Sequence, residues 1–219
     1  MALAWILAWI FVAAPPSLWG NEETAAREKS YTTREMIRTG NFYLLFGAMG
    51  FGLMSYFLIS PISQDVLAEK GIAPGLAAGA VTLGSAANAG LRLLLPAWSD
   101  RVGRSVCIRW VMILSGVIMA VLWLFSSYAA VVAVVFLYGY YGGIMGLFPS
   151  YTSSIFGLRH AGENYAYVLL GMVAASLAAP LAAQRAAAAG AGRWPLFALG
   201  ITFTVLAYIC MIQLERRTQ

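Results

Sequence analysis

The sequence predicts an all-α, polytopic transmembrane helical bundle with about six membrane-crossing helices. Of its 219 residues, 61% are hydrophobic and only 11% are charged, and the mean hydropathy is +0.75. A soluble domain of this length is about half apolar and about a quarter charged. Too few polar side chains remain to cover a water-facing surface, so lipid is the solvent that fits this composition.

Six apolar stretches are each long enough to cross a bilayer. A helix needs roughly 20 mostly apolar residues to cross about 30 Å of hydrocarbon, and helices are the only spanning structure that fits such long, non-alternating runs. The six stretches are residues 41–63, 75–98, 106–126, 128–150, 164–185 and 194–214. We therefore expect one six-helix transmembrane domain.

This domain covers residues 41–219, and two other segments precede it. Residues 1–14 are apolar but too short to span comfortably, and we interpret them as the C-terminal remnant of a transmembrane helix that two prolines then stop. Residues 15–40 are polar and charged, which predicts a cytoplasmic linker. Within the linker, Thr33 is expected to cap a short amphipathic helix.

Basic residues predict the orientation of the bundle, because cytoplasmic loops of membrane proteins carry an excess of Lys and Arg. With the linker and the C-terminus in the cytoplasm, ten of the 14 basic residues are cytoplasmic and three lie on the opposite side. The ten are Arg27, Lys29, Arg34, Arg38, Arg101, Arg104, Arg109, Arg159, Arg216 and Arg217, and the three are Lys70, Arg185 and Arg193. We expect a multi-pass protein of the cell membrane.

The remaining basic residue, Arg92, falls inside a predicted span. A charge at the bilayer centre costs about 2.5–3.5 kcal/mol even on a lenient scale, so such a residue normally faces a cavity or a partner. Ser85, Asn88 and Arg92 share one helix face, at i, i+3 and i+7. We expect this face to line a water-filled path in which the guanidinium binds a small carboxylate. The alternative is a structural or gating use, in which Arg92 snorkels to the nearby interface or bonds to carbonyl groups.

The loop after this span carries Asp100, Arg101 and Arg104 around Gly103, a residue that permits a tight turn. These charges are expected to bridge neighbouring helix ends on the cytoplasmic face, where such bridges make and break as a transporter rocks. A plain basic cytoplasmic loop is the alternative.

Tyr141 belongs to an aromatic and glycine-rich run in the middle of the fourth complete span. Aromatic residues are more usual at the membrane interfaces than at mid-helix. Tyr141 therefore either walls a substrate cavity or packs in the core.

Two motifs resemble those of a known family. The D-R-x-G-R turn at residues 100–104 resembles the loop repeated in both halves of the major facilitator superfamily. Residues 141–151 and 155–166 resemble the oxalate/formate antiporter family within it. The resemblance implies twelve helices in two six-helix halves with substrate bound between them. This chain would then supply the C-terminal half and the end of helix six, with a missing N-terminal half or a second copy as its partner.

The resemblance also implies roles for individual residues. Arg92 falls where the family's helix-eight arginine binds the dicarboxylate, and Tyr141 falls where an aromatic residue lines the site. Met172 stands where the oxalate transporter carries a second cation. One cation suits a monocarboxylate better than a dianion, so the expected substrate is a small monoanion such as formate or another short organic acid.

These observations predict a transporter that moves a small organic anion by alternating access, through exchange or symport. No enzyme, catalytic residue, cofactor or metal site is expected, because the single histidine, His160, and all the acidic residues lie in loops or at helix ends. Scattered basic residues also form no patch for nucleic acid. The alternative is a non-transporting half-length membrane protein, either a truncated gene product or an assembly subunit.

Overall fold

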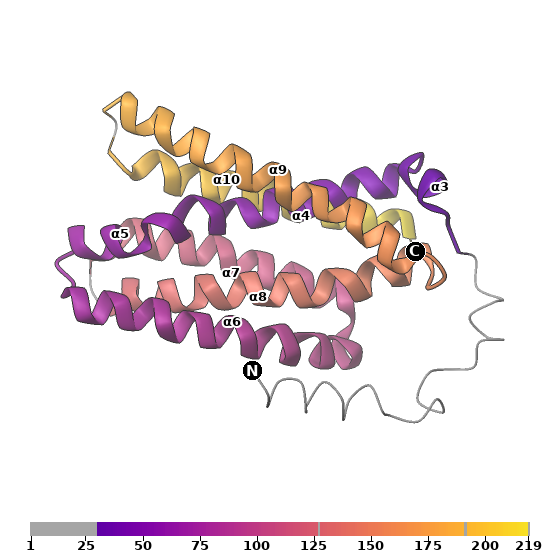
Figure 1. The fold of residues 1–219 in the computed structure, drawn as a ribbon, viewed down its shortest axis with the longest axis horizontal. Coiled ribbons are helices and arrows are strands. Elements are labelled where there is room, and N and C mark those ends of the chain that lie inside the picture. The colour runs from indigo at the N-terminus through magenta and orange to yellow at the C-terminus, as the bar shows by residue number, and fades with distance from the viewer. Residues whose placement is uncertain (1–29, 127, 191, 219) are drawn as a thin grey trace, which may run out of the picture.

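The computed structural model describes residues 30–126, 128–190 and 192–218. These residues form helices, with no strand among them, and the long helices run side by side (Figure 1). This confirms the predicted fold class. The helix remnant expected over residues 1–14 and the first part of the linker lie outside the described residues.

A short helix precedes a series of long ones. The first elements are α3 (Thr33–Ile37), α4 (Gly40–Ile59), the 3-10 helix η2 (Ser60–Ile62) and α5 (Ser63–Glu69). The long helices that follow are α6 (Pro74–Val102), α7 (Arg104–Leu124), α8 (Tyr128–Phe156), α9 (Ala161–Ala188) and α10 (Trp194–Thr218). The first predicted span is divided because Pro61 lacks the N–H that a continuing helix needs.

Within the described ranges, five helical segments are long and apolar enough to cross a membrane. They are Gly40–Glu69, Arg104–Leu124, Tyr128–Phe156, Ala161–Ala188 and Trp194–Thr218. The remaining predicted span, residues 75–98, lies in α6. This helix has 29 residues but is not among these five segments. Its glycines and its polar residues Ser85, Asn88 and Arg92 lower its hydropathy. Both Ser85 and Arg92 are exposed, so α6 carries a polar face for which lipid is a poor solvent.

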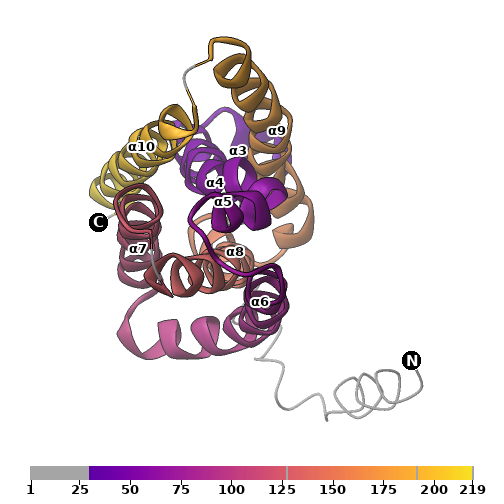
Figure 2. The ribbon, with the colours of Figure 1, turned by 90° about the vertical axis from the view of Figure 1, so that its left-hand side faces the viewer.

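Helix α4 occupies the centre of the bundle. It contacts α7, α8, α9 and α10, and the view along the bundle in Figure 2 shows these helices around it. Its side chains are apolar on all sides, which is typical of a buried helix. Leu45, Met49 and Leu53 of α4 are fully buried. Helix α6 lies further out and packs mainly against α8.

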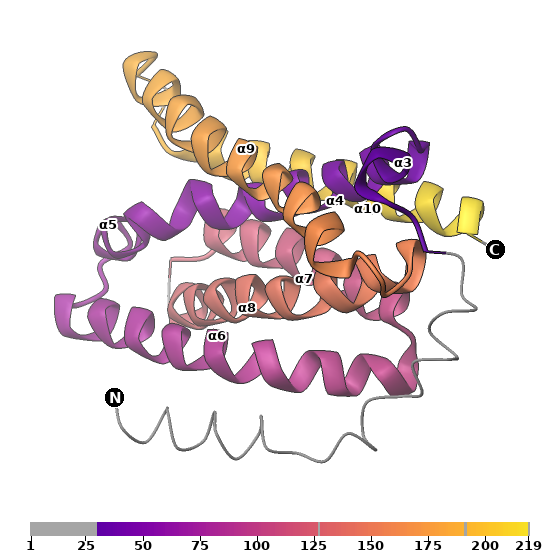
Figure 3. The same cartoon turned by 45° about the vertical axis from the view of Figure 1, so that its right-hand side comes forward.

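Glycine residues on α8 bring α6 into backbone contact with it. The Asn88 carbonyl oxygen occupies the space that a Cβ atom at Gly142 would need. The Arg92 carbonyl oxygen lies 2.5 Å from the corresponding position at Gly146. Small residues allow membrane helices to approach this closely. The two helices run in the same direction, side by side in Figure 3, so Asn88 lies level with Gly142 and Arg92 with Gly146.

A buried cluster of hydroxyl groups joins three helices. Ser55 Oγ of α4 lies 3.2 Å from Thr204 Oγ1 of α10, and Ser115 Oγ of α7 lies 3.4 Å from the same atom. Thr204 Oγ1 also donates to the Gly200 carbonyl oxygen at 2.9 Å. Hydrogen bonds between membrane helices contribute about 0.6–2 kcal/mol each. The cluster therefore ties α7 and α10 to the central helix.

The connections between helices gather at two ends of the bundle (Figure 1). One end, called the linker end here, holds α3, the α6–α7 turn, the α8–α9 loop and the C-terminus. The opposite end holds the other loops. At the linker end, α6 and α7 are separated by Gly103 alone, whose φ of 105° only glycine adopts readily. Which compartment each end faces stays a prediction.

The cap of the linker helix lies one residue earlier than expected. Thr32, not Thr33, caps α3, and it forms a capping box with Glu35. The reason is spacing, because the acidic residue must lie three positions after the cap to reach back to its N–H. The Thr33 hydroxyl instead donates to Glu163 Oε2 of α9 at 3.3 Å.

Replacement of Gly142 by Ala should lower the free energy of unfolding by about 1–3 kcal/mol, because the new methyl group overlaps the Asn88 carbonyl. The matched control is Gly79→Ala in α6, where no atom lies within 4 Å of the added Cβ. This control should unfold at the wild-type temperature or slightly above it. Thermal unfolding of both variants in detergent tests the contact, and equal melting temperatures would contradict it.

Candidate functional site

Two of the predicted site residues, Tyr141 of α8 and Met172 of α9, meet in the structure. The Tyr141 hydroxyl lies 3.9 Å from Met172 Sδ, toward which it donates. A thioether sulfur is a weak acceptor, so this contact holds the two side chains together without satisfying the hydroxyl strongly. Both side chains are partly buried.

An aromatic wall, formed by Tyr56, Phe57, Tyr138 and Tyr141, surrounds this contact. The Tyr56 and Tyr141 rings stack with centroids 4.2 Å apart and planes 15° apart. Tyr138 meets Tyr56 edge-on at 5.5 Å, and Phe57 meets Tyr141 edge-on at 6.1 Å. Such pairs contribute about 0.5–1.5 kcal/mol beyond the area they bury. No sequence pattern joins Tyr56 to Tyr141, since the stack depends on how α4 packs against α8.

Arg92 projects from the exposed face of α6. Its backbone lies level with Gly146 of α8, five residues after Tyr141. In the described ranges, no carboxylate forms a salt bridge with Arg92. The Arg92 guanidinium is therefore open to a partner from outside the described residues.

The other polar residues of α6 differ in their surroundings. Asn88 is partly buried, and its position level with Gly142 places it between Arg92 and the level of Tyr141. The exposed Ser85 hydroxyl donates to the Val81 carbonyl oxygen of its own helix at 2.9 Å. Asn88 therefore lies nearer to Arg92 along α6 than Ser85 does, and the Ser85 hydroxyl already has a hydrogen-bond partner.

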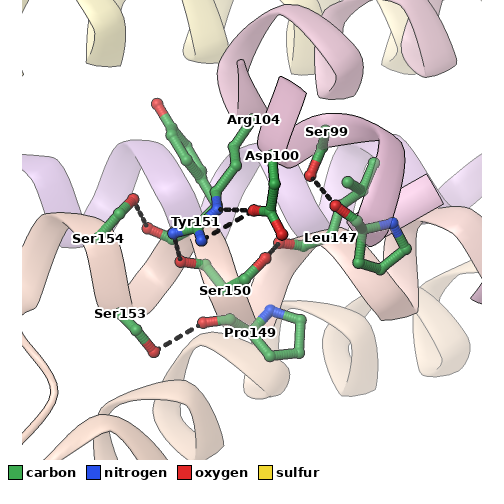
Figure 4. Close-up of polar contacts among 10 residues, drawn as sticks. Ser99, Asp100, Arg104, Leu147, Pro149, Ser150, Tyr151, Ser153 and Ser154 are labelled. Atoms are coloured by element: carbon green, nitrogen blue, oxygen red, sulfur yellow. Dashed lines mark hydrogen bonds and ion pairs between the residues drawn. The ribbon is translucent and has the colours of Figure 1, made fainter. Parts of the chain in front are cut away.

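Asp100 and Arg104 join three helices at the linker end (Figure 4). Arg104 Nη2 lies 3.0 Å from Asp100 Oδ1, and Arg104 Nη1 donates to the Ser150 carbonyl oxygen of α8 at 3.0 Å. Both side chains are substantially exposed, so the ion pair contributes no more than about 1 kcal/mol. Arg101 is exposed in the last turn of α6. A role of these residues in gating stays a prediction.

A second ion pair at this end links α7 to α10. Arg109 Nη1 lies 2.9 Å from Glu215 Oε2, and the Ser105 hydroxyl donates to Glu215 Oε1 at 3.1 Å. The two helices are distant in sequence, so the basic pattern of the loop did not identify this pair.

The last residues of the linker are hydrogen-bonded to the end of α8, the α8–α9 loop and the start of α9. The Tyr31 N–H donates to the Phe156 carbonyl oxygen at 2.9 Å, and the Tyr31 carbonyl accepts from Asn164 Nδ2 at 3.0 Å. The Arg159 N–H donates to Ser30 Oγ at 3.2 Å. Asn164 is fully buried, and no described residue pairs with its Oδ1 atom. This residue of the second motif therefore anchors the linker.

The opposite end is joined by other charged groups. Arg193 Nε lies 2.8 Å from Glu69 Oε2, and Lys70 Nζ donates to the Phe125 carbonyl oxygen at 2.7 Å. Burial lowers the pKa of the Lys70 amine, and the nearby Glu69 carboxylate partly offsets this effect. These contacts connect the α5–α6, α7–α8 and α9–α10 loops.

A bundle of membrane-crossing helices that carries an arginine without a carboxylate partner among the described residues is typical of membrane transport proteins. The family model of the Major Facilitator Superfamily matches residues 1–180. The chain belongs to this superfamily. The resemblance carried by the two sequence motifs is thereby confirmed.

Two relatives narrow the comparison. The chain is 31% identical over 150 residues to YhjX, an uncharacterised MFS-type transporter of Escherichia coli (strain K12), across 66% of this chain and 37% of that protein. It is 28% identical over 187 residues to the oxalate:formate antiporter of Oxalobacter formigenes, across 81% of this chain and 43% of that protein. The matches thus span less than half the length of either relative.

Replacement of Asn164 by Leu should release the linker from α9, because Leu cannot donate to the Tyr31 carbonyl. Loss of a buried hydrogen bond of this kind costs about 1–3 kcal/mol. Hydrogen–deuterium exchange should become faster at the backbone amides of residues 31–37. Thr33→Val, which removes only the exposed contact with Glu163, is the control and should leave exchange nearly unchanged. Equal protection in both variants would show that Asn164 is no anchor.

Proposed function

We propose that this chain provides the carboxylate-binding six-helix bundle of an alternating-access transporter for small monocarboxylate anions. The observation that carries the proposal is Arg92, an exposed cation on the polar face of α6 without a carboxylate partner in the described part of the chain. A guanidinium binds a carboxylate through two parallel hydrogen bonds. Family membership and the likeness to an oxalate:formate antiporter support an organic anion as the ligand.

The charge of the site favours a monoanion. Arg92 provides one positive charge, and Met172 stands where the resemblance places a second cation. Tyr165 offers a neutral hydroxyl group, which satisfies a carboxylate oxygen without neutralising another charge. A second carboxylate on the substrate would therefore lose its water without gaining an ion pair, which is costly in a low-dielectric site.

The mechanism follows from the position of this cation. An anion enters between the described bundle and a second bundle, which is either an N-terminal half or a second copy, and it pairs with Arg92. The two bundles then rock around the occupied site and expose it to the other side of the membrane. Asp100 and Arg104, half-exposed at the linker end, form contacts that this movement breaks and remakes.

Exchange of one anion for another is the coupling that the described residues favour. Proton symport requires a carboxylate or histidine that takes up a proton at membrane depth. The acidic residues of the described ranges lie in short segments, loops or terminal turns of the helices, not at mid-span; they are Glu35, Asp65, Glu69, Asp100, Glu163 and Glu215.

The positive-inside rule favours a cytoplasmic position for the linker end, because ten basic residues are assigned to its side.

Proteoliposomes that contain the purified chain should show saturable uptake of labelled formate or lactate, with less uptake of oxalate. Arg92→Ala should reduce uptake about tenfold or more, because a charge-assisted hydrogen bond contributes about 1.5–3 kcal/mol. Arg185→Ala is the control, since Arg185 is exposed near the opposite end of α9 and should leave uptake unchanged.

Well-folded protein that takes up none of the three acids would contradict transport by this chain alone. Co-reconstitution with an N-terminal half would then decide between a two-chain transporter and a non-transporting membrane protein. Uptake that survives Arg92→Ala would remove Arg92 from the substrate site.

A further inference from the structure

We infer that the substrate of this site is a monocarboxylate with an apolar tail of several carbons, and that Met172 and Tyr56 contact the tail. This inference rests on the proposed function, because it requires that Arg92 binds the carboxylate. It adds a second region to the site, with its own chemistry and its own position along the bundle.

The first step is the distance along α8 between the two regions. Arg92 lies level with Gly146, whereas Tyr141 lies five residues earlier in α8. A helix rises 1.5 Å per residue, so Tyr141 lies about 7 Å further from the linker end than the backbone of Arg92. Asn88, level with Gly142, lies between the two levels.

Positions along α9 place the two regions in the same order from the linker end. Tyr165 lies near the start of α9 at the linker end, which is also the end toward which Arg92 lies from Tyr141. Met172, whose sulfur contacts Tyr141, lies seven residues later, which corresponds to about 10 Å along the helix. Positions i and i+7 lie on one helix face, so both side chains are directed to the same side of α9.

The chemistry of the deeper region is apolar. Met172 presents a thioether, and the Tyr141 hydroxyl is already directed toward its sulfur. Tyr56 and Phe57 add ring surface beside Tyr141. No described Lys, Arg or His occurs in α4 or α8, or in α9 between His160 and Arg185. An anionic group would find no ionic partner at this level, whereas alkyl or aryl carbon would find thioether and aromatic surface.

Substrate length follows from these two steps. A one-carbon acid bound to Arg92 makes no contact with Met172 or Tyr56. A dicarboxylate of sufficient length places its second charge against sulfur and aromatic carbon. A monocarboxylate with a short alkyl chain or a ring satisfies both regions, and each added methylene should tighten binding about fourfold, by the free energy of burying one CH₂ group.

The test is equilibrium binding of a chain-length series to the purified chain in nanodiscs, with formate, acetate, butyrate, hexanoate and oxalate as probes. The dissociation constant should fall about fourfold per methylene from acetate to butyrate, and oxalate should bind more weakly than butyrate. Binding to Arg92→Gln is subtracted from every measurement, because longer acids also partition into lipid.

Three substitutions separate the two regions. Met172→Lys should weaken butyrate binding and strengthen oxalate binding, each by about tenfold, whereas the control Val173→Lys on the exposed neighbour should do neither. Tyr56→Ala should flatten the chain-length dependence, because it removes ring surface from the tail region. If Met172→Lys does not fold, Met172→Gln keeps the length of the side chain and should flatten the series as well.

The outcomes distinguish this inference from the proposed function. If folded wild-type protein binds none of the acids, the proposed function fails and this inference fails with it. Acids could bind in an Arg92-dependent way but with equal affinity along the series, or oxalate could bind as tightly as butyrate. Either result would contradict only the inference that an apolar tail contacts Met172 and Tyr56. An unchanged series in both the Met172 and the Tyr56 variants would also overturn it.

Discussion

Backbone contact between α6 and α8 sets the position of the cation in the candidate site. The carbonyl groups of Asn88 and Arg92 rest on Gly142 and Gly146, where no larger residue fits without displacing them. This contact fixes the register of α6 along α8, and therefore the level of the guanidinium relative to Tyr141. A helix with a polar face is unfavourable in lipid, and packing of its other face against glycine compensates for the weak hydrophobic driving force.

The remainder of the bundle supports this arrangement from the centre outward. Helix α4 places Tyr56 on Tyr141 and joins α7 and α10 through the Ser55, Ser115 and Thr204 hydroxyls. Ion pairs and main-chain contacts then connect the helix ends. The site consequently belongs to four helices, α4, α6, α8 and α9, and movement of any one of them relative to the others changes its shape. This property suits a protein that alternates between two conformations.

The exposed surface of the chain divides into two kinds. Helices α7 and α10 present large apolar side chains outward, including Trp110, Val117 and Val205, and these suit lipid. Helix α6 also exposes apolar side chains such as Leu93 and Leu94, but a separate face of it carries Ser85 and Arg92, which lipid does not suit. Under the proposed function, a second bundle and a water-filled path cover this face.

Hydropathy and charge along the chain were enough to predict the helical membrane fold, the approximate helix boundaries and the unusual position of Arg92. These are local properties, because a span of apolar residues partitions into lipid whatever its neighbours are. The cap at Thr32, which was expected at Thr33, and the break at Pro61, which was not expected, also depend on local sequence. The stack of Tyr56 on Tyr141, the pair of Arg109 with Glu215 and the anchoring of the linker by Asn164 required the tertiary structure. Each depends on the rotation and register of packed helices, and in lipid these are set by small-residue contacts and interhelical hydrogen bonds between residues far apart in sequence.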